Sequence, residues 1–242
     1  AIGYAALKLN TATGNTAIGS DCLDANTTGA SLVAVGYRAL SANTTANNNV
    51  AVGQDSMISN TTGTENVSVG TYTLYTNTTG GSNTALGSRS LYTNNASNNT
   101  AVGRNALYEN TTGAANSAVG AYALASNTTG TRNTAMGYQA LSANTTADDN
   151  TAIGRHALLV NTTGGSNTAL GKSAMTDSTT GDANTAIGMN CMLANTTGSQ
   201  NVAVGAQALD AITTASYNVA IGYHALTANT ISGNTAFGHQ AL

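Results

Sequence analysis

The sequence has no proline, no tryptophan, one phenylalanine and two cysteines among its 242 residues, and only 7% of its residues are charged. The lack of proline suits a chain whose backbone N–H groups are committed to hydrogen-bonded ladders, because proline has no N–H to donate. The formal net charge is −3 and no basic stripe is present to neutralise phosphates, so we expect no nucleic-acid binding. No apolar run approaches the ~20 residues of a membrane-spanning helix, so we expect no membrane span in this segment.

The chain consists instead of one short repeat, N-[T/V]-A-[I/V/L]-G-x-x-A-L-x-x-N-T-T-G-x-x. A strict short period indicates one supersecondary unit stacked on itself, so we expect a single repeat array over residues 1–242 and not an enzyme. Both ends fall inside a repeat, and we therefore expect the array to be a segment of a longer fibre chain. The recurring glycines are spaced 16 or 17 residues apart: Gly3, Gly19, Gly36, Gly53, Gly70, Gly87, Gly103, Gly120, Gly137, Gly154, Gly171, Gly188, Gly205, Gly222 and Gly238.

The positions of this repeat predict the fold. With the recurring glycine as position 5, position 3 is nearly always alanine, position 4 is always apolar, and position 9 is always leucine or methionine. The short unit and its N-T-T-G punctuation favour strands and tight turns over helices. We predict an all-β parallel β-solenoid of 15 coils with about 17 residues each. It would be a β-roll with two strands per coil, near positions 1–5 and 8–12, with positions 4 and 9 both in the core.

Asparagine recurs at positions 1 and 12 of the repeat. Stacked coils would place equivalent amides ~4.8 Å apart, which is the spacing of a side-chain amide ladder. Cys22 and Cys191 share another position, ten repeats apart, and at this rise they would be roughly 48 Å from each other. A disulfide needs Cα atoms within ~7 Å, so we expect two small buried thiols that do not pair within the chain.

The repeat supplies few large apolar side chains for the number of residues that it must order. An isolated roll is therefore expected to be short of buried apolar area, and we predict a homo-oligomer, with a trimer as the favoured state. Two surfaces are candidates for the contact. One is a small-residue stripe formed by the alanines at position 3 and the glycines at position 5, and the other is the T/V-x-I face formed by positions 2 and 4.

The segments Asn15–Gly19 (NTAIG) and Asn201–Gly205 (NVAVG) resemble the head repeat of trimeric autotransporter adhesins, the YadA-like head, and are similar to repeats of bacteriophage tail fibres. The resemblance covers the whole chain, although the unit is longer than the usual head repeat. It implies a left-handed parallel β-roll, three chains around an axis, and attachment at a cell or virion surface. A cell-surface glycan or host receptor is the implied partner.

Three functions follow from these patterns. The first is an adhesive surface fibre, either an adhesin head or a phage tail-fibre shaft, and the second is an extracellular structural filament assembled end to end, with or without attached sugar. The third is an ice-binding solenoid, which is disfavoured because the threonine pairs lie in a predicted turn and valine interrupts position 2. Each of these places the chain outside the cell or on a virion.

No catalytic, metal-binding or cofactor-binding constellation is found in the sequence, and His156, His224 and His239 are expected to be solvent-exposed turn residues. Tyr75, Tyr92 and Tyr108 share position 10 in three successive coils and predict an aromatic column. A stacking ladder is the first interpretation of this column, and glycan contact is the alternative.

The repeated Asn-Thr-Thr tripeptide is formally an N-glycosylation sequon, and its threonines are alternative acceptors for O-linked sugar. The candidate N-glycosylation sites are Asn26, Asn43, Asn60, Asn77, Asn110, Asn127, Asn144, Asn161 and Asn195.

Overall fold

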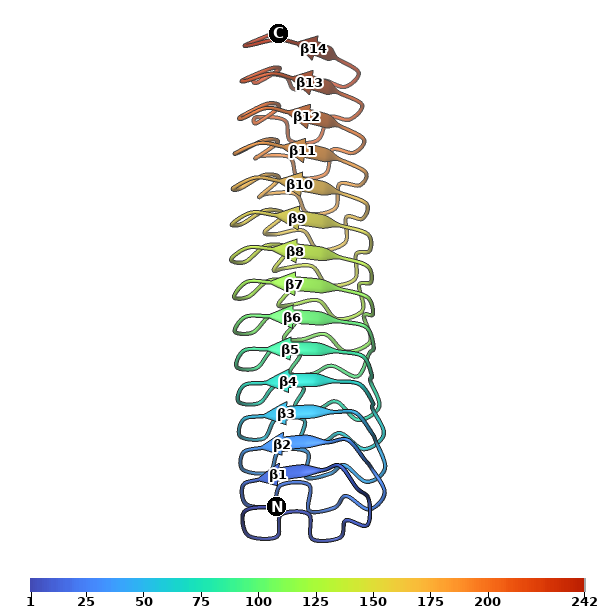
Figure 1. Ribbon diagram of the computed structural model, residues 1–242. Helices are drawn as coiled ribbons and strands as arrows, with labels where there is room; N and C mark the ends of the chain where they lie inside the picture. The colour runs from blue at the N-terminus through green and yellow to red at the C-terminus, as the bar shows by residue number, and fades with distance from the viewer. Residues whose placement is uncertain (242) are drawn as a thin grey trace. The chain divides into compact units, whose positions relative to one another are not determined.

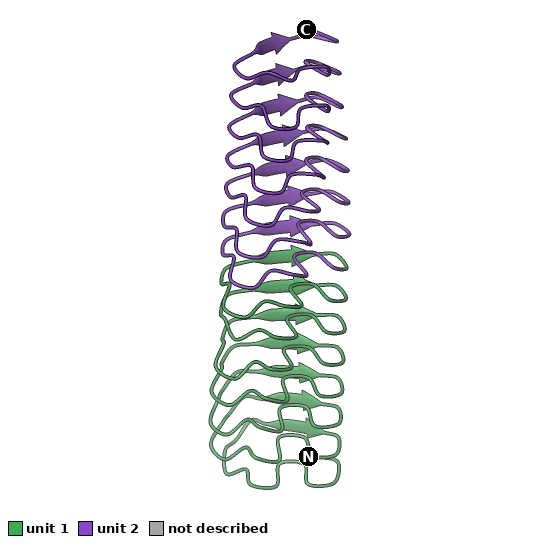
Figure 2. Cartoon of the chain, turned by 180° about the vertical axis from the view of Figure 1, so that it is seen from behind, with its two compact units in different colours: residues 1–121 green, residues 122–242 purple. Residues whose placement is uncertain are grey.

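In a computed structural model, which describes residues 1–241, every coil from Thr16 onward contributes one three-residue strand at repeat positions 2–4. The chain divides into two units, Ala1–Ala121 and Tyr122–Leu242, shown in green and purple in Figure 2. Unit 1 holds β1 (Thr16–Ile18), β2 (Val33–Val35), β3 (Val50–Val52), β4 (Val67–Val69), β5 (Thr84–Leu86), β6 (Thr100–Val102) and β7 (Ser117–Val119). Unit 2 holds β8 (Thr134–Met136), β9 (Thr151–Ile153), β10 (Thr168–Leu170), β11 (Thr185–Ile187), β12 (Val202–Val204), β13 (Val219–Ile221) and β14 (Thr235–Phe237).

Within each unit, consecutive strands pair in parallel with equivalent repeat positions opposite each other. Ala17 of β1 lies opposite Ala34 of β2, and Ala169 of β10 lies opposite Ala186 of β11. Figure 1 shows the strands of each unit one above another in chain order. An isolated bridge between Ile2 and Ile18 marks a further coil before β1. No helix occurs in residues 1–241, and the predicted parallel β-solenoid with about 17 residues per coil is confirmed.

The prediction of a second strand at positions 8–12 is wrong. Positions 7 and 9 have left-handed backbone, with φ of 54° at Gln139 and 53° at Leu141, and this segment forms a turn. Alternating left-handed residues fold the chain too sharply for an extended ladder. Successive coils are still joined there, since the Leu141 N–H donates to the Ala157 carbonyl oxygen at 2.9 Å.

The backbone at position 9 explains its restricted composition. Its leucines and methionines have φ between 46° at Leu74 and 54° at Leu40. A side chain branched at Cβ is strongly disfavoured at positive φ, whereas Leu and Met branch further out or not at all. Position 9 therefore excludes valine and isoleucine while still supplying the one large, fully buried side chain of most coils, such as Leu40 and Met57.

The core of each coil is narrower than predicted, because position 4 does not belong to it. Successive side chains of a strand point to opposite faces. Alanines at position 3, such as Ala34 and Ala152, are fully buried, so positions 2 and 4 face outward. The same geometry corrects the small-residue stripe: its position-3 alanines face inward and form no outer surface. The interior consists of these alanines, the small residues at position 8, the leucines and methionines at position 9, and the asparagines at positions 1 and 12.

Ser68, which replaces the usual alanine at position 3 of β4, is accommodated by a buried hydroxyl cluster. Ser56 Oγ donates to Ser68 Oγ at 2.8 Å, and Ser68 Oγ donates to Thr73 Oγ1 at 2.5 Å. All three side chains are buried. A buried hydroxyl needs a hydrogen-bond partner, and here position 8 supplies it, with Ser56 from the preceding coil and Thr73 from the coil of Ser68 itself.

Candidate functional site

The outer sheet face, which we define as the side chains at positions 2 and 4 of the strands, is a regular surface of each unit that the coil itself leaves partly exposed. In β2 this face consists of Val33 and Val35, and in β9 of Thr151 and Ile153. All of its position-4 residues are apolar and lie side by side in register on consecutive strands.

Each position-4 side chain of this face is partly or largely exposed to solvent, and none is fully buried. Ile18 and Leu170 are each 41% exposed, and Met136 is 44% exposed. Scattered exposed apolar residues are normal, but a continuous row of them on a flat sheet is typical of an interaction surface. The outer sheet face is therefore the strongest candidate for a contact with another chain.

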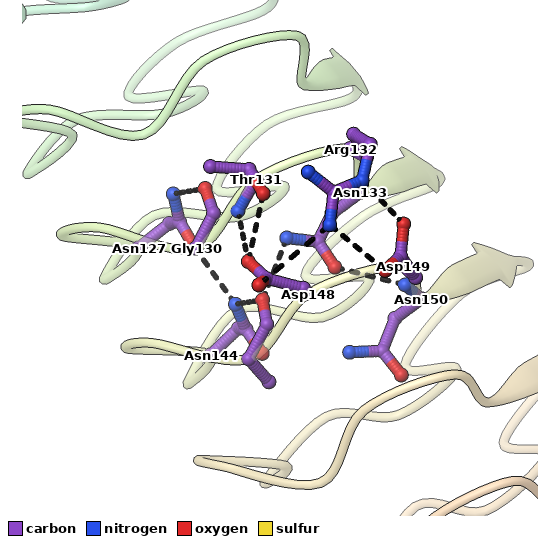
Figure 3. A network of polar contacts seen from close by, with 10 residues as sticks. Asn127, Gly130, Thr131, Arg132, Asn133, Asn144, Asp148, Asp149 and Asn150 are labelled. Carbon is purple, nitrogen blue, oxygen red and sulfur yellow. Dashed lines mark hydrogen bonds and ion pairs between the residues drawn. The ribbon is translucent and has the colours of Figure 1, made fainter.

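The asparagines at position 12 form the predicted amide ladder inside the coil, as Figure 3 shows for unit 2. Asn144 Nδ2 donates to Asn127 Oδ1 at 2.8 Å and to the Ala147 carbonyl oxygen at 3.1 Å. The asparagines at position 1 form a second ladder. Asn66, for example, donates from its backbone N–H to Asn49 Oδ1 at 2.9 Å, and its Nδ2 donates to the Gly80 carbonyl oxygen at 3.0 Å.

These ladders enclose the nine asparagines that the sequence marks as N-glycosylation candidates. All nine side chains are fully buried, and each Nδ2 donates to the carbonyl oxygen three residues further on, as Asn26 does to Gly29 at 2.9 Å. The folded coil gives a glycosyltransferase no access to these nitrogens, so the structure does not present them as attachment sites. The nine are Asn26, Asn43, Asn60, Asn77, Asn110, Asn127, Asn144, Asn161 and Asn195.

The two threonines of the repeated tripeptide have different environments. The first, at position 13, uses its hydroxyl between coils: Thr27 Oγ1 donates to the Thr44 carbonyl oxygen at 3.0 Å, and Thr162 Oγ1 donates to that of Thr179 at 3.1 Å. The second, at position 14, is exposed, as at Thr28 and Thr163. Of the pair, position 14 is therefore the one that presents its hydroxyl to solvent.

The aromatic column has the geometry of a stacking ladder. The ring centroids of Tyr75 and Tyr92 lie 5.0 Å apart in parallel planes, and those of Tyr92 and Tyr108 lie 5.1 Å apart at 18°. Tyr72 meets Tyr75 edge-on at 5.6 Å, and the Arg89 guanidinium lies 6.0 Å from the centre of the Tyr72 ring. Tyr72 and Arg89 are not among the residues predicted for this column. Both residues occupy position 7, on neighbouring coils, and this shared position is the only signal in the sequence. Their approach to the tyrosines of position 10 is visible only in the folded chain.

The acidic pair Asp148 and Asp149 lies in a turn of unit 2 and binds Arg132 (Figure 3). Arg132 Nε donates to Asp149 Oδ1 at 2.7 Å and its Nη2 donates to Asp149 Oδ2 at 3.0 Å. This hydrogen bonding lowers the pKa of the Asp149 carboxyl. Asp148 Oδ1 also accepts from the Thr131 N–H at 2.6 Å, so both carboxylates serve to join coils.

The histidines do not converge on a site. His239 is exposed as predicted, whereas His156 and His224 are half-buried. Burial lowers the pKa of His156, and the nearby charges of Arg155 and Lys172 lower it further. Within residues 1–241, no three His, Cys, Asp or Glu side chains are grouped as metal ligands would be. No helix in that part of the chain has the length and apolar character needed to cross a membrane.

Both cysteines are free and fully buried, as predicted. Burial raises the pKa of the Cys22 thiol to about 11 and that of the Cys191 thiol to about 12. Each Sγ donates to a carbonyl oxygen of the adjacent strand, Cys22 to Ala34 at 3.2 Å and Cys191 to Ala203 at 3.3 Å. The thiolate is the reactive form of cysteine, so these thiols fill space in the core and are not poised for chemistry.

Comparison with protein-family models, with curated proteins and with solved structures gives no match for this chain.

Proposed function

We propose that this chain forms part of a homotrimeric fibre on a cell or virion surface, that its coils are left-handed, and that the fibre mediates attachment. The uncovered outer sheet face carries the proposal. Within residues 1–241, its apolar position-4 row stays partly exposed, and copies of the same chain are the simplest partner for a surface that repeats with the period of the chain itself.

The small interior of each coil supports the same conclusion. Most coils bury one large apolar side chain, at position 9, and surround it with alanine and asparagine. Covering the outer sheet face would add position 4, and in part position 2, to the buried apolar surface of each coil. At about 25 cal/mol per Å² of apolar area removed from water, this gain accumulates along every coil of the array. The number three and the handedness rest on the resemblance to adhesin head repeats.

Charges placed on the outer sheet face are expected to dissociate the assembly. Sedimentation equilibrium of the native chain should give a mass three times that of the 24.0 kDa chain. The double variant Val52→Lys/Ile153→Lys puts one lysine at position 4 in each unit, and each would bury an unpaired charge in the contact. A buried unpaired charge costs several kcal/mol, so the dissociation constant should rise by at least about a hundredfold.

The matched control is Met189→Lys, which places the same charge on an exposed turn residue at position 6. This variant should keep the native mass. A native chain that sediments as a single copy would contradict the proposal, as would a double variant that keeps the mass of the native assembly.

A further inference from the structure

Four of the ten tyrosines gather in one patch of unit 1, and the repeat itself shows that the coil does not need them there. The other coils serve as internal controls. Position 10 is serine at Ser41 and Ser142 and alanine at Ala125, and those coils have the same turns and strands. Features that every coil shares hold the solenoid together, whereas a cluster of departures from the repeat indicates a local specialisation.

The patch is hollowed. A depression of about 370 Å³ is lined by Tyr72, Tyr75, Arg89, Tyr92 and Tyr108. A second depression of about 420 Å³ lies against Tyr72 and Arg89 as well, and its remaining lining residues are Thr71, Ser88 and Arg104. The Tyr72–Arg89 pair therefore separates two hollows, one aromatic and one lined by hydroxyl and guanidinium groups. We call the two together the Tyr–Arg hollow.

The Tyr–Arg hollow is positively charged, although the protein as a whole carries a formal charge of −3. Its lining includes two arginines and no carboxylate. Arg89 takes part in none of the ion pairs found in the described part of the chain, and its guanidinium lies against the Tyr72 ring. A planar guanidinium without an acidic partner is suited to bind a carboxylate or sulfate.

The remaining groups of the hollow favour a saccharide as the carrier of that anion. Tyrosine rings offer apolar faces and edges to the C–H groups of a sugar, and their hydroxyls offer hydrogen bonds to its hydroxyls. Burial, together with the neighbouring Tyr75 and Tyr108, raises the pKa of Tyr92, so its phenol remains a donor at neutral pH. Thr71 and Ser88 add further hydroxyls beside Arg89. An inorganic anion would use only the arginines, and a neutral sugar would leave Arg89 without a partner.

We propose that the Tyr–Arg hollow binds an acidic saccharide, with its carboxylate or sulfate on Arg89 and its ring against Tyr72 and the aromatic column. This inference deepens the attachment function proposed above by naming the ligand class and the residues that would hold it. The carboxylated and sulfated forms share the same recognition chemistry, and the experiment below separates them.

The test is a titration of the intact chain with sialyllactose, a heparin-derived tetrasaccharide and lactose, followed by calorimetry. Because the chain has no tryptophan, tyrosine emission provides a second readout, to which the column contributes three of the ten tyrosines. We expect one acidic saccharide to bind and lactose to bind at least about tenfold more weakly. The acidic probe that binds identifies the anion as carboxylate or sulfate.

The repeat supplies variants that keep the fold. Arg89→Gln introduces a residue that other coils carry at position 7 with the same left-handed backbone, as at Gln139 and Gln207, and Tyr92→Ser introduces the residue found at Ser41. Each should weaken binding by about tenfold or more. The controls Arg155→Gln and Tyr223→Ser remove the same groups from turns of unit 2, outside the hollow, and should bind as the native chain does.

Four results would overturn the inference: lactose binding as tightly as the acidic probes, unchanged affinity in Arg89→Gln, no binding of either acidic probe, or a polyglutamate peptide binding as tightly as the saccharides at the same residues. The assembly mass and the circular dichroism of each sample are recorded before titration. If the native assembly binds no acidic saccharide, the proposed ligand site is wrong and the fibre proposal is unaffected. If the native chain has the mass of a single copy, the fibre proposal is wrong whatever the binding result.

Discussion

Alanine in place of Gly137 should lower the free energy of unfolding by on the order of 3 kcal/mol or more. Gly137 has φ of 135°, a conformation that residues with a side chain rarely adopt. A Cβ at this position would also lie 2.6 Å from the Gly154 carbonyl oxygen of the next coil, far inside van der Waals contact. The backbone of the next coil cannot move away without breaking its own ladder, so strain and steric clash add together.

Gly233→Ala is the matched control, because it separates the two causes. Gly233 also has positive φ, at 80°, but nothing lies within 4 Å of its added Cβ. Its replacement should cost only the backbone term, about 1 kcal/mol. Urea unfolding followed by circular dichroism measures both variants. If the two variants lose equal free energy of unfolding, close stacking of the coils is not what requires glycine at position 5.

Interrupting the asparagine ladder at Asn60 is expected to cost about 2–4 kcal/mol. Asn60 Nδ2 donates to Asn43 Oδ1 at 3.2 Å and to the Gly63 carbonyl oxygen at 3.0 Å, and Asn60 Oδ1 accepts from Asn77 Nδ2 at 3.0 Å. Asn60→Leu has the same branched shape and number of heavy atoms but removes all three bonds, and it leaves Asn43 Oδ1 buried without this donor. Asn47→Leu removes a single exposed hydrogen bond, from the Ala30 N–H to Asn47 Oδ1 at 2.8 Å, and should lower the free energy of unfolding by only about 1 kcal/mol or less.

The chain contains the reverse case. Ser178 interrupts the ladder of unit 2 at position 12, and both Asn161 Oδ1 and Ser178 Oγ are buried without a hydrogen-bond partner. Ser178→Asn would bring an amide Nδ2 to Asn161 Oδ1, so this variant should be more stable than the native chain by about 1–2 kcal/mol. Thermal unfolding of the two ladder variants should therefore shift in opposite directions. A shift in the same direction would mean that the ladder is not a stabilising network.

The sequence was sufficient to predict the coil and its inner ladders, because both depend only on period. Once equivalent residues stack in register, asparagines at a fixed position must meet, and so must Tyr75, Tyr92 and Tyr108. The column geometry follows that expectation, with successive centroids 5.0 and 5.1 Å apart.

The misplaced elements have physical reasons as well. Their size and apolar character place the position-4 side chains in the predicted core, although the nearly constant alanine beside them, which must face the opposite side, is the better guide. The strand predicted at positions 8–12 is wrong because ordinary residues such as Leu141 carry the left-handed backbone of the turn found there, and sequence alone does not mark them. The Tyr–Arg hollow depends on how side chains of three coils converge, which no periodic pattern specifies.

Oxidation of two methionines by hydrogen peroxide tests most directly whether the outer sheet face is covered by other copies of the chain. Met136 lies on that face and is 44% exposed in the single chain, and Met189 lies on a turn and is 48% exposed. Peptide mass spectrometry on the native assembly should find Met189 converted to sulfoxide and Met136 protected by at least about tenfold, close to the buried Met175. Equal oxidation of Met136 and Met189 would show an uncovered face and contradict the account.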